Sequence, residues 1–521
     1  MALVLTGKVV TFDPARRVLD DGVVYVSDDG LIAAVQPRSE QAPSGFSSAK
    51  RVETGGVIYP GLIDLHNHIA YNTLPLWQAP SVPYAHHDSW TGEDDYGETV
   101  TWPARELQQA AAEALIKYVE VKALIGGTTA IQGAPRTTRP VQGWLIRLVD
   151  TQRFGGGGDL IRAATIQKRP DQLQLEAQKM RDGSVLIYHV AEGKAGEKVP
   201  LDEFGDLDNS GCLQSRLVGV HATALKAADF ERWRKTIATS ETGQRATVAW
   251  SPFSNLWLYD ETTDVRAARR KKLRIALGSD WGPSGTKHVL GELKLADILN
   301  KRRFGGGEFS DLELCELVTL NPGEALGRAW GDRLGRLQPN AEADLVVVAP
   351  HRPDVYRNLI EATEKHVQLV VVRGKAFYGT QALMKAAGAT GTNAIRVAGE
   401  SRRVLVKMAG NKDAKLTWRG VLDELERVRA NPEQAWKDSA NALASWGGPL
   451  DAPDAPLAIF GDMPEGDLGV LGATGEIPPG LKIPPLDSLE HDDDFFAALK
   501  GTAAQRPASA ADLNELERYY T

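Results

Sequence analysis

Histidines and carboxylates stand at the ends of four short apolar segments in this sequence. These ends read LHNH with His66 and His68, YHVAEG with His189 and Glu192, GVHAT with His221, and LGSD with Asp280. Imidazole nitrogen and carboxylate oxygen are ligands that suit borderline divalent metal ions such as zinc. The two cysteines, Cys212 and Cys315, are too few for a thiolate site or a disulfide framework. The sequence therefore predicts a metal site built from histidine and carboxylate.

Such a set of side chains is typical of a metal-dependent hydrolase. A bound divalent ion lowers the pKa of a water ligand from about 15.7 towards 7, which makes hydroxide accessible at neutral pH. A neighbouring carboxylate can then move the proton of that water to the leaving group. One carboxylate, Glu192, stands three residues after His189.

The segments that carry these residues alternate with amphipathic runs such as 104–126, a pattern that predicts a parallel sheet wrapped by helices. Eight candidate strands fit a (β/α)8 barrel, in which catalytic side chains lie at the carboxyl ends of the strands. The fourth strand has the weakest pattern. The candidate strands are 57–66, 128–133, 145–151, 160–166, 185–190, 217–222, 247–252 and 273–280.

Three regions are expected along the chain. Residues 58–330 form the catalytic barrel, and the strand-rich segments 1–57 and 331–380 join into one small β-sandwich domain. Residues 381–521 form a C-terminal extension of helices and loops, with an amphipathic helix at 418–430 and an acidic stretch at 490–499 that we interpret as a solvated face. The pattern assigns no chemistry to this extension.

Composition limits the class of protein. The 521 residues contain 42% hydrophobic and 25% charged residues, as in an ordinary globular protein, and the net charge of −8 argues against a nucleic-acid partner. The start of the sequence is not typical of a signal peptide, and no stretch is apolar enough for a membrane helix. With only two cysteines, we expect a cytoplasmic protein that acts on a small molecule, without a membrane partner.

The order of the motifs resembles a known family. PGLIDLHNH, GTTAI, HVAEG, GVHAT, SPFSNLWL, GSDWG, TLNPGEALG and ADLVVV follow one another as in the amidohydrolase superfamily, most similar to its cytosine deaminase and triazine chlorohydrolase branch. The resemblance covers about residues 1–380. It implies one divalent ion, zinc or alternatively iron(II), and a homodimer. It also implies a role for each motif residue: His66, His68, His189 and Asp280 as ligands, Glu192 as proton shuttle, His221 as the group that orients water or polarises substrate, and Asp280 also as acceptor of the water proton.

The substrate is expected to be small and cyclic or aromatic. Five tryptophans lie near the presumed mouth of the barrel, and the long segment 69–103 is a plausible lid. Candidate substrate contacts are Trp77, Trp281 and Asn255. Trp281 stands where the resembling branch has a small residue, which alters the wall of the pocket. The five tryptophans are Trp77, Trp90, Trp250, Trp257 and Trp281.

Alternatives remain open at this point. Lys168 follows the fourth candidate strand, where binuclear relatives carry a carboxylated lysine that bridges two ions; a solvated lysine is the simpler interpretation. A non-catalytic assembly protein with the same fold is a second alternative, although all the expected ligands are present. Deamination and the opening of an amide or lactam would use the same residues, so the sequence does not separate them.

Overall fold

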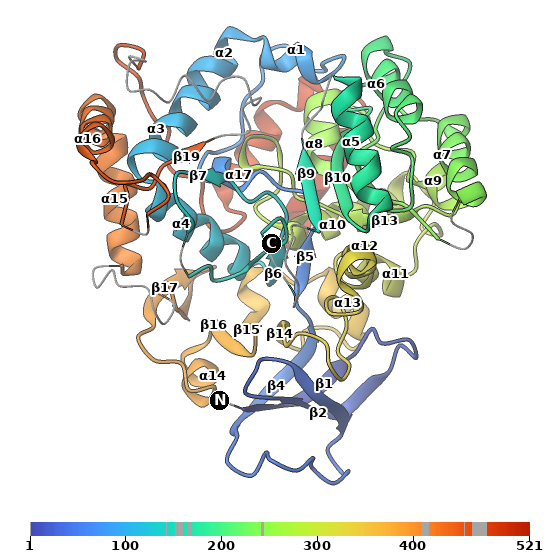
Figure 1. The fold of residues 1–521 in the computed structure, drawn as a ribbon. Helices are drawn as coiled ribbons and strands as arrows, with labels where there is room; N and C mark the ends of the chain where they lie inside the picture. Colours follow the sequence, from blue (N-terminus) through green and yellow to red (C-terminus); the bar gives the residue numbers. More distant parts are fainter. Residues whose placement is uncertain are drawn as a thin grey trace.

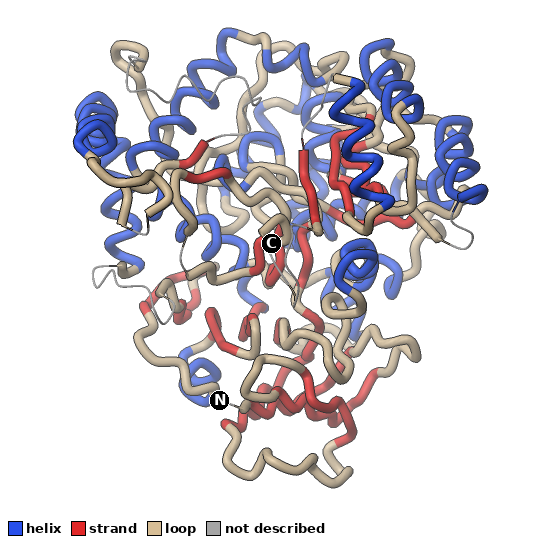
Figure 2. The backbone as a smooth tube through the Cα atoms, viewed as in Figure 1, coloured by secondary structure: helices blue, strands red, loops and turns tan. Residues whose placement is uncertain are grey.

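In the computed structural model, the described residues are 2–141, 143–151, 154, 160–164, 169–240, 244–407, 416–452, 454–460 and 477–521. Strands gather in two regions, one at the lower end of Figure 1 and one among the helices above it; Figure 2 shows the same division in red. The upper region holds a five-stranded and a three-stranded parallel sheet, and the lower region holds a nine-stranded mixed sheet. Among the described residues, no helix is both long and apolar enough to cross a bilayer.

The parallel strands occur where the sequence predicts them. The five-stranded sheet has the order β13-β12-β11-β10-β9, and the three-stranded sheet has the order β5-β6-β8. Backbone hydrogen bonds from Leu65 N to Leu277 O and from His68 N to Asp280 O join the chain after β5 to β13 and the residues that follow it. The strands are β5 (Leu62–Asp64), β6 (Thr128–Ile131), β8 (Arg147–Leu148), β9 (Ile161–Ala164), β10 (Val185–Val190), β11 (Leu217–His221), β12 (Thr247–Trp250) and β13 (Arg274–Leu277).

Helices follow most of these strands and pack against the outer face of the sheets, where they bury the apolar side chains of the strands. The strands themselves are almost wholly buried and apolar, as β10 (VLIYHV) and β11 (LVGVH) show, because a parallel sheet is covered on both faces. The helix expected at 104–126 is divided at Ala111 into two. The helices of this region are α1 (His87–Thr91), α2 (Asp94–Tyr96), α3 (Trp102–Ala110), α4 (Ala112–Ile125), α5 (Pro170–Arg181), α6 (Lys198–Asn209), α7 (Ala227–Ser240), α8 (Pro252–Tyr259), α9 (Val265–Arg270), α10 (Val289–Arg302), α11 (Asp311–Glu316) and α12 (Leu320–Trp330).

The nine-stranded sheet is built from the segments that precede and follow the region of parallel strands. Its order is β17-β18-β16-β15-β14-β4-β1-β2-β3, and β4 pairs in parallel with β1 and antiparallel with β14. The two last strands alternate buried and exposed residues and continue the sheet beyond residue 380, so the predicted boundary of the extension falls inside it. The strands are β1 (Leu3–Val10), β2 (Val18–Val26), β3 (Ile32–Pro37), β4 (Lys50–Pro60), β14 (Leu345–Val348), β15 (Val367–Val372), β16 (Lys375–Gly379), β17 (Asn393–Val397) and β18 (Glu400–Val404).

The C-terminal helices pack against the helical region. The helix predicted at 418–430 is present with those bounds as α15, and its Trp418 stacks on Tyr118 of α4. The interpretation of 490–499 as a solvated face is wrong, because Phe495, Phe496 and Leu499 of α17 are buried. The three aspartates at the start of this helix make the segment look polar, but its apolar residues fall on one face, which is buried. The remaining elements are α13 (Val355–Ile360), α14 (Gln381–Ala386), α16 (Pro432–Ser445), α17 (Asp493–Gly501), α18 (Ala510–Glu515) and the short strand pair β7 (Arg136–Thr137) and β19 (Ile459–Phe460).

One carboxylate fixes the C-terminal segment to this body. Asp487 is almost fully buried and contacts the ammonium groups of both Lys122 and Lys287. The Tyr118 hydroxyl donates a hydrogen bond to the backbone carbonyl of Asp487. The extension is therefore docked through buried polar groups as well as through its apolar face.

Candidate metal centre

Five of the residues that the sequence singled out converge at the carboxyl ends of the parallel strands. One ligand atom from each of His66, His189 and His221 lies within 4.8 Å of the others, and the same holds for His66, His68 and Asp280. The Nε2 atoms of His66 and His68 lie 3.2 Å and 3.7 Å from Asp280 Oδ1. Imidazoles from three strand ends and one carboxylate thus face a common point.

The local backbone at these strand ends is unusual. His221 and Asp280 have φ values of 62° and 63°, in the left-handed region that non-glycine residues rarely adopt, and Ala191 has a φ of 47°. Each such residue costs on the order of 1–3 kcal/mol and persists only where the surroundings impose it, which is common at functional sites. A Cβ atom at Gly278 would lie 2.5 Å from His66 Cβ, so glycine is required where the two strand ends meet.

A buried hydrogen bond prepares His66 for a cation. Gln132 Oε1 accepts from the backbone N–H of Asn67 and lies 3.2 Å from His66 Nδ1, so Nδ1 carries the proton and Nε2 keeps its lone pair. Among the described residues, His66 Nε2 is buried without a hydrogen-bond partner, although Asp280 Oδ1 is 3.2 Å away. Nδ1 of His189 is likewise buried, and no described residue hydrogen-bonds to it. Two orphaned imidazole nitrogens beside a carboxylate fit a divalent metal ion.

The charges of the cluster agree with that fit. Burial and the neighbouring His66, His221 and His68 lower the pKa of His189 well below its usual value, so its imidazole is neutral, as a ligand must be. Burial opposes ionisation of Asp280, but the neighbouring imidazoles, that of His66 first, outweigh it and hold the pKa of Asp280 well below its usual range.

Glu192 and His221 lie beside the cluster and are each held by a buried partner. The Tyr259 hydroxyl donates to Glu192 Oε1 at 2.6 Å. Asn255 Nδ2 donates to Thr263 Oγ1, which leaves Asn255 Oδ1 to accept the proton of His221 Nδ1 at 3.0 Å. His221 Nε2 is consequently unprotonated and lies 3.8 Å from Glu192 Oε1. Asn255 is fully buried behind His221, a position that favours orientation of this imidazole.

Aromatic rings pack together beside His68. The Trp281 ring lies 6.2 Å from the ring of His68 and 5.7 Å from that of Trp90. Tyr71 and Tyr96 pack against Trp281 as well. A wall of this kind suits a flat, apolar ligand.

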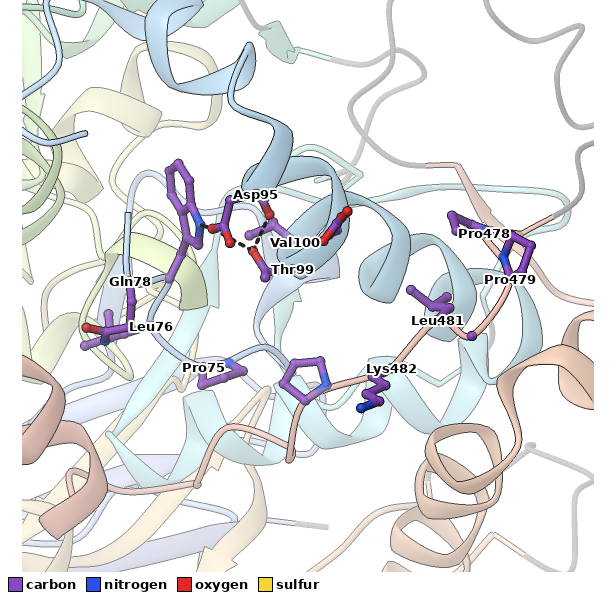
Figure 3. A pocket seen from close by; sticks show the side chains of 14 residues that line it. Pro75, Leu76, Gln78, Asp95, Thr99, Val100, Pro478, Pro479, Leu481 and Lys482 are labelled. Carbon is purple, nitrogen blue, oxygen red and sulfur yellow. Dashed lines mark hydrogen bonds between the residues drawn. The ribbon is translucent and has the colours of Figure 1, made fainter. Parts of the chain in front are cut away.

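The other predicted tryptophans make contacts of a different kind. Trp250 and Trp257 are fully buried in the hydrophobic core. Trp77 stacks on Tyr84 and donates its indole N–H to Asp95. It also lines a cavity of about 590 Å³ between segment 75–100 and the C-terminal residues 478–484, shown in Figure 3. No residue of the metal cluster lines this cavity.

Two site residues were missed by the sequence patterns. Gln132 directly follows β6, so the rule that strand ends carry the site would have found it. Tyr259 ends α8 and reaches Glu192 across the fold, which no local pattern indicates. Lys168, the residue on which a binuclear site depends, lies outside the described residues.

A second buried cluster could also hold a cation by composition. One ligand atom from each of His288, Glu364 and His491 lies within 4.8 Å of the other two. The cluster joins the start of α10 to the C-terminal segment. Glu364 Oε1 accepts from both imidazoles and from the backbone N–H of His491. His491 Nε2 accepts from Lys287 N, so its Nδ1 carries a proton and is not a metal ligand. This cluster is a hydrogen-bonded contact of the extension.

Comparison with known proteins supports the resemblance deduced from the motifs. Residues 172–377, which include His189, Glu192, His221 and Asp280, match the Amidohydrolase family. The chain contains an amidohydrolase family domain. The chain is 25% identical over 415 residues to the 5-methylthioadenosine/S-adenosylhomocysteine deaminase of Syntrophobacter fumaroxidans, covering 72% of the chain and 92% of the relative. It is 23% identical to the guanine deaminase of Escherichia coli, covering 64% and 83% of the two chains.

Solved structures share the fold of this chain. A zinc-bound adenosine deaminase from Xanthomonas campestris matches with a TM-score of 0.59 and 19% identity, covering 83% of the chain and 98% of the neighbour. Zinc-bound atrazine chlorohydrolase from Arthrobacter aurescens matches with a TM-score of 0.55 and 18% identity, covering 72% and 95%. At these identities the likeness establishes the fold alone.

Proposed function

We propose that this amidohydrolase is a metal-dependent hydrolase that removes an amino group from a small aromatic nitrogen heterocycle. The observation that carries the proposal is the convergence of His66, His68, His189 and Asp280 beside a held Glu192. The curated relatives named above are deaminases, which favours deamination over amide or lactam opening. The eight parallel strands are best understood as a (β/α)8 barrel, and the nine-stranded sheet as the β-domain that flanks it.

We propose that one zinc ion is held by His66, His68, His189 and Asp280. Nitrogen and oxygen donors suit zinc, and the two structural neighbours described above are zinc-bound. Bound there, the ion would act as a Lewis acid and lower the pKa of water. The orphaned Nε2 of His66 is the direct support for this donor set.

The chain's own residues supply positioning and proton movement. The Glu192 carboxylate takes a proton from the attacking water and gives it to the leaving nitrogen. His221, kept in one tautomer by Asn255, presents the lone pair of its Nε2, which accepts a hydrogen bond from the attacking water and orients it. Trp281, Trp90 and Tyr96 form the wall against which a flat ring packs.

The test is ammonia release from a panel of amino-substituted purines, their nucleosides and amino-triazines, by wild type and Glu192→Gln. Ammonia from wild type and a loss of about 10²- to 10⁴-fold in kcat for Glu192→Gln are expected, the usual range for a general acid–base residue. A new carboxylate and amine without ammonia, from an amide or lactam control, would replace deamination by amide hydrolysis. Unchanged turnover in Glu192→Gln would remove Glu192 from the mechanism.

A further inference from the structure

The short helix α8 supplies the partners of both groups proposed to act on the attacking water. Asn255 orients His221, and Tyr259 contacts Glu192. The Tyr259 oxygen also accepts a hydrogen bond of 2.9 Å from the indole N–H of Trp90. Because that N–H occupies the oxygen from one side, the phenolic proton points to Glu192 Oε1.

The end of α8 is held by segments distant in sequence. The last carbonyl groups of a helix have no partner within it and must find one elsewhere. Trp257 O accepts from Arg506 Nε at 2.6 Å, and Leu258 O accepts from Tyr84 N at 2.9 Å. The Ser509 hydroxyl lies 3.4 Å from Leu256 O. The C-terminal segment therefore satisfies much of the helix end.

Arg506 makes this contact strong. Its side chain is 1% exposed, and its guanidinium lies 3.6 Å from the centre of the Trp257 ring. A cation is favourable at the carboxyl end of a helix dipole, and stacking on an indole adds to that attraction. Asp260, the left-handed residue that ends α8, accepts from Ala508 N at 3.0 Å and from the Ser509 hydroxyl.

We propose that Tyr259 is the positioning residue of Glu192, and that residues 502–512 of the C-terminal segment keep it in place by capping α8. The segment, to which the sequence assigned no chemistry, thereby becomes part of the active-site framework. The role given to Glu192 rests on the proposed function, whereas the capping of α8 stands without it.

Tyr259→Phe tests the first half, with Tyr59→Phe as the matched control. Tyr59 is equally buried, donates at 2.6 Å to Val355 O and accepts at 3.2 Å from Asn358, but lies in the nine-stranded sheet. Tyr259→Phe is expected to lower kcat about 10- to 100-fold, part of the contribution of a positioned proton carrier, with KM within about twofold. Tyr59→Phe is expected to leave both unchanged. Equal losses in the two variants, or an unchanged kcat in Tyr259→Phe, would overturn the assignment.

Thermal unfolding of the double variant gives a readout that needs no substrate. Residues in direct contact show non-additive effects, so the shifts in unfolding midpoint for Tyr259→Phe and Glu192→Gln should not sum in the double variant. The shifts for Tyr59→Phe and Glu192→Gln should sum. Additive shifts for the first pair would show that the Tyr259–Glu192 contact has no energetic consequence and would overturn the assignment even if no deamination were found.

Arg506→Met tests the second half, with the exposed Arg518→Met as its control. Hydrogen exchange of peptides that cover 252–260 should accelerate at least tenfold in Arg506→Met and stay at the wild-type rate in Arg518→Met. Zinc content measured by elemental analysis should remain the same in both, since no ligand is altered. Unchanged exchange in α8 for Arg506→Met would refute the capping role, whatever the outcome of the ammonia assay.

Discussion

Replacement of Asp487 by asparagine should loosen the C-terminal segment, because two buried ammonium groups depend on this carboxylate. The side chains of Lys122 and Lys287 are 2% and 4% exposed, and both contact Asp487. Removing one partner of a buried ion pair costs roughly 3–5 kcal/mol, since the remaining charge is left uncompensated. At 1.4 kcal/mol for each tenfold change, that cost raises the equilibrium constant for local opening by a factor of roughly 10² to 4 × 10³.

The pH dependence of this effect has a definite sign. Burial, partly offset by Asp487, lowers the pKa of Lys122 to about 8 in the folded protein, against 10.5 as its ordinary value. In Asp487→Asn the offset is lost and this pKa falls below 8. As the pH rises from 7 to 9, the folded variant releases the proton of Lys122 while the unfolded chain still binds it, so the variant regains stability relative to wild type.

The assay is hydrogen exchange of peptides from 118–125 and 484–500 at pH 7 and pH 9, each corrected for intrinsic exchange rates. The exposed Asp202→Asn, whose partner Lys198 is also exposed, should exchange like wild type at both values. Wild-type exchange in Asp487→Asn at pH 7, or an acceleration of equal size at the two pH values, would refute the reasoning.

Two further predictions concern buried side chains near the site and in the helical region. Gln132→Leu removes the acceptor of the His66 Nδ1 proton and should weaken zinc binding about 10- to 100-fold, measured in competition with a chelator. The control is Gln214→Leu, which replaces a buried glutamine away from the site and should leave the zinc affinity unchanged. Equal zinc affinities in the two variants would contradict the role of Gln132. Burial raises the pKa of Glu106 to about 8, and neither carboxyl oxygen has a hydrogen-bond partner. Between about pH 4.5 and 8 the folded chain then binds one proton more than the unfolded chain. The free energy of unfolding of wild type, measured in urea, should therefore fall by up to about 1.4 kcal/mol per pH unit across that window, whereas that of Glu106→Gln should not. Parallel pH profiles for the two proteins would contradict this.

The positions of the proposed ligands could be predicted from the sequence because strand ends are local features. His66, His189 and Asp280 each close an apolar run, and the parallel arrangement brings such ends to one side. The helix at 418–430 was predictable for the same reason, since its period of apolar residues lies within 13 residues. The resemblance to the amidohydrolase family followed from the order of these local motifs, and residues 172–377 match that family.

What the sequence could not supply depends on contacts between distant segments. Tyr259 reaches Glu192, and Arg506 reaches α8, across separations that no periodicity encodes. The burial of Trp250 and Trp257 follows from what covers them rather than from their neighbours in the chain. The same holds for 490–499, where the aspartates that begin α17 concealed an apolar face.

The central place of β4 in the nine-stranded sheet has a consequence during protein synthesis. Its antiparallel neighbour β14 begins only at Leu345, so one edge of β4 stays unpaired while the whole middle of the chain is made. At the usual speed of translation this lasts roughly 15–60 s, long enough for an open edge to recruit another nascent chain. The part of β4 that pairs with β14 is Val57–Pro60, and the proline that ends it has no N–H to donate to another strand. Pro60 thus limits how far a second nascent chain can pair along this edge of β4 before β14 emerges.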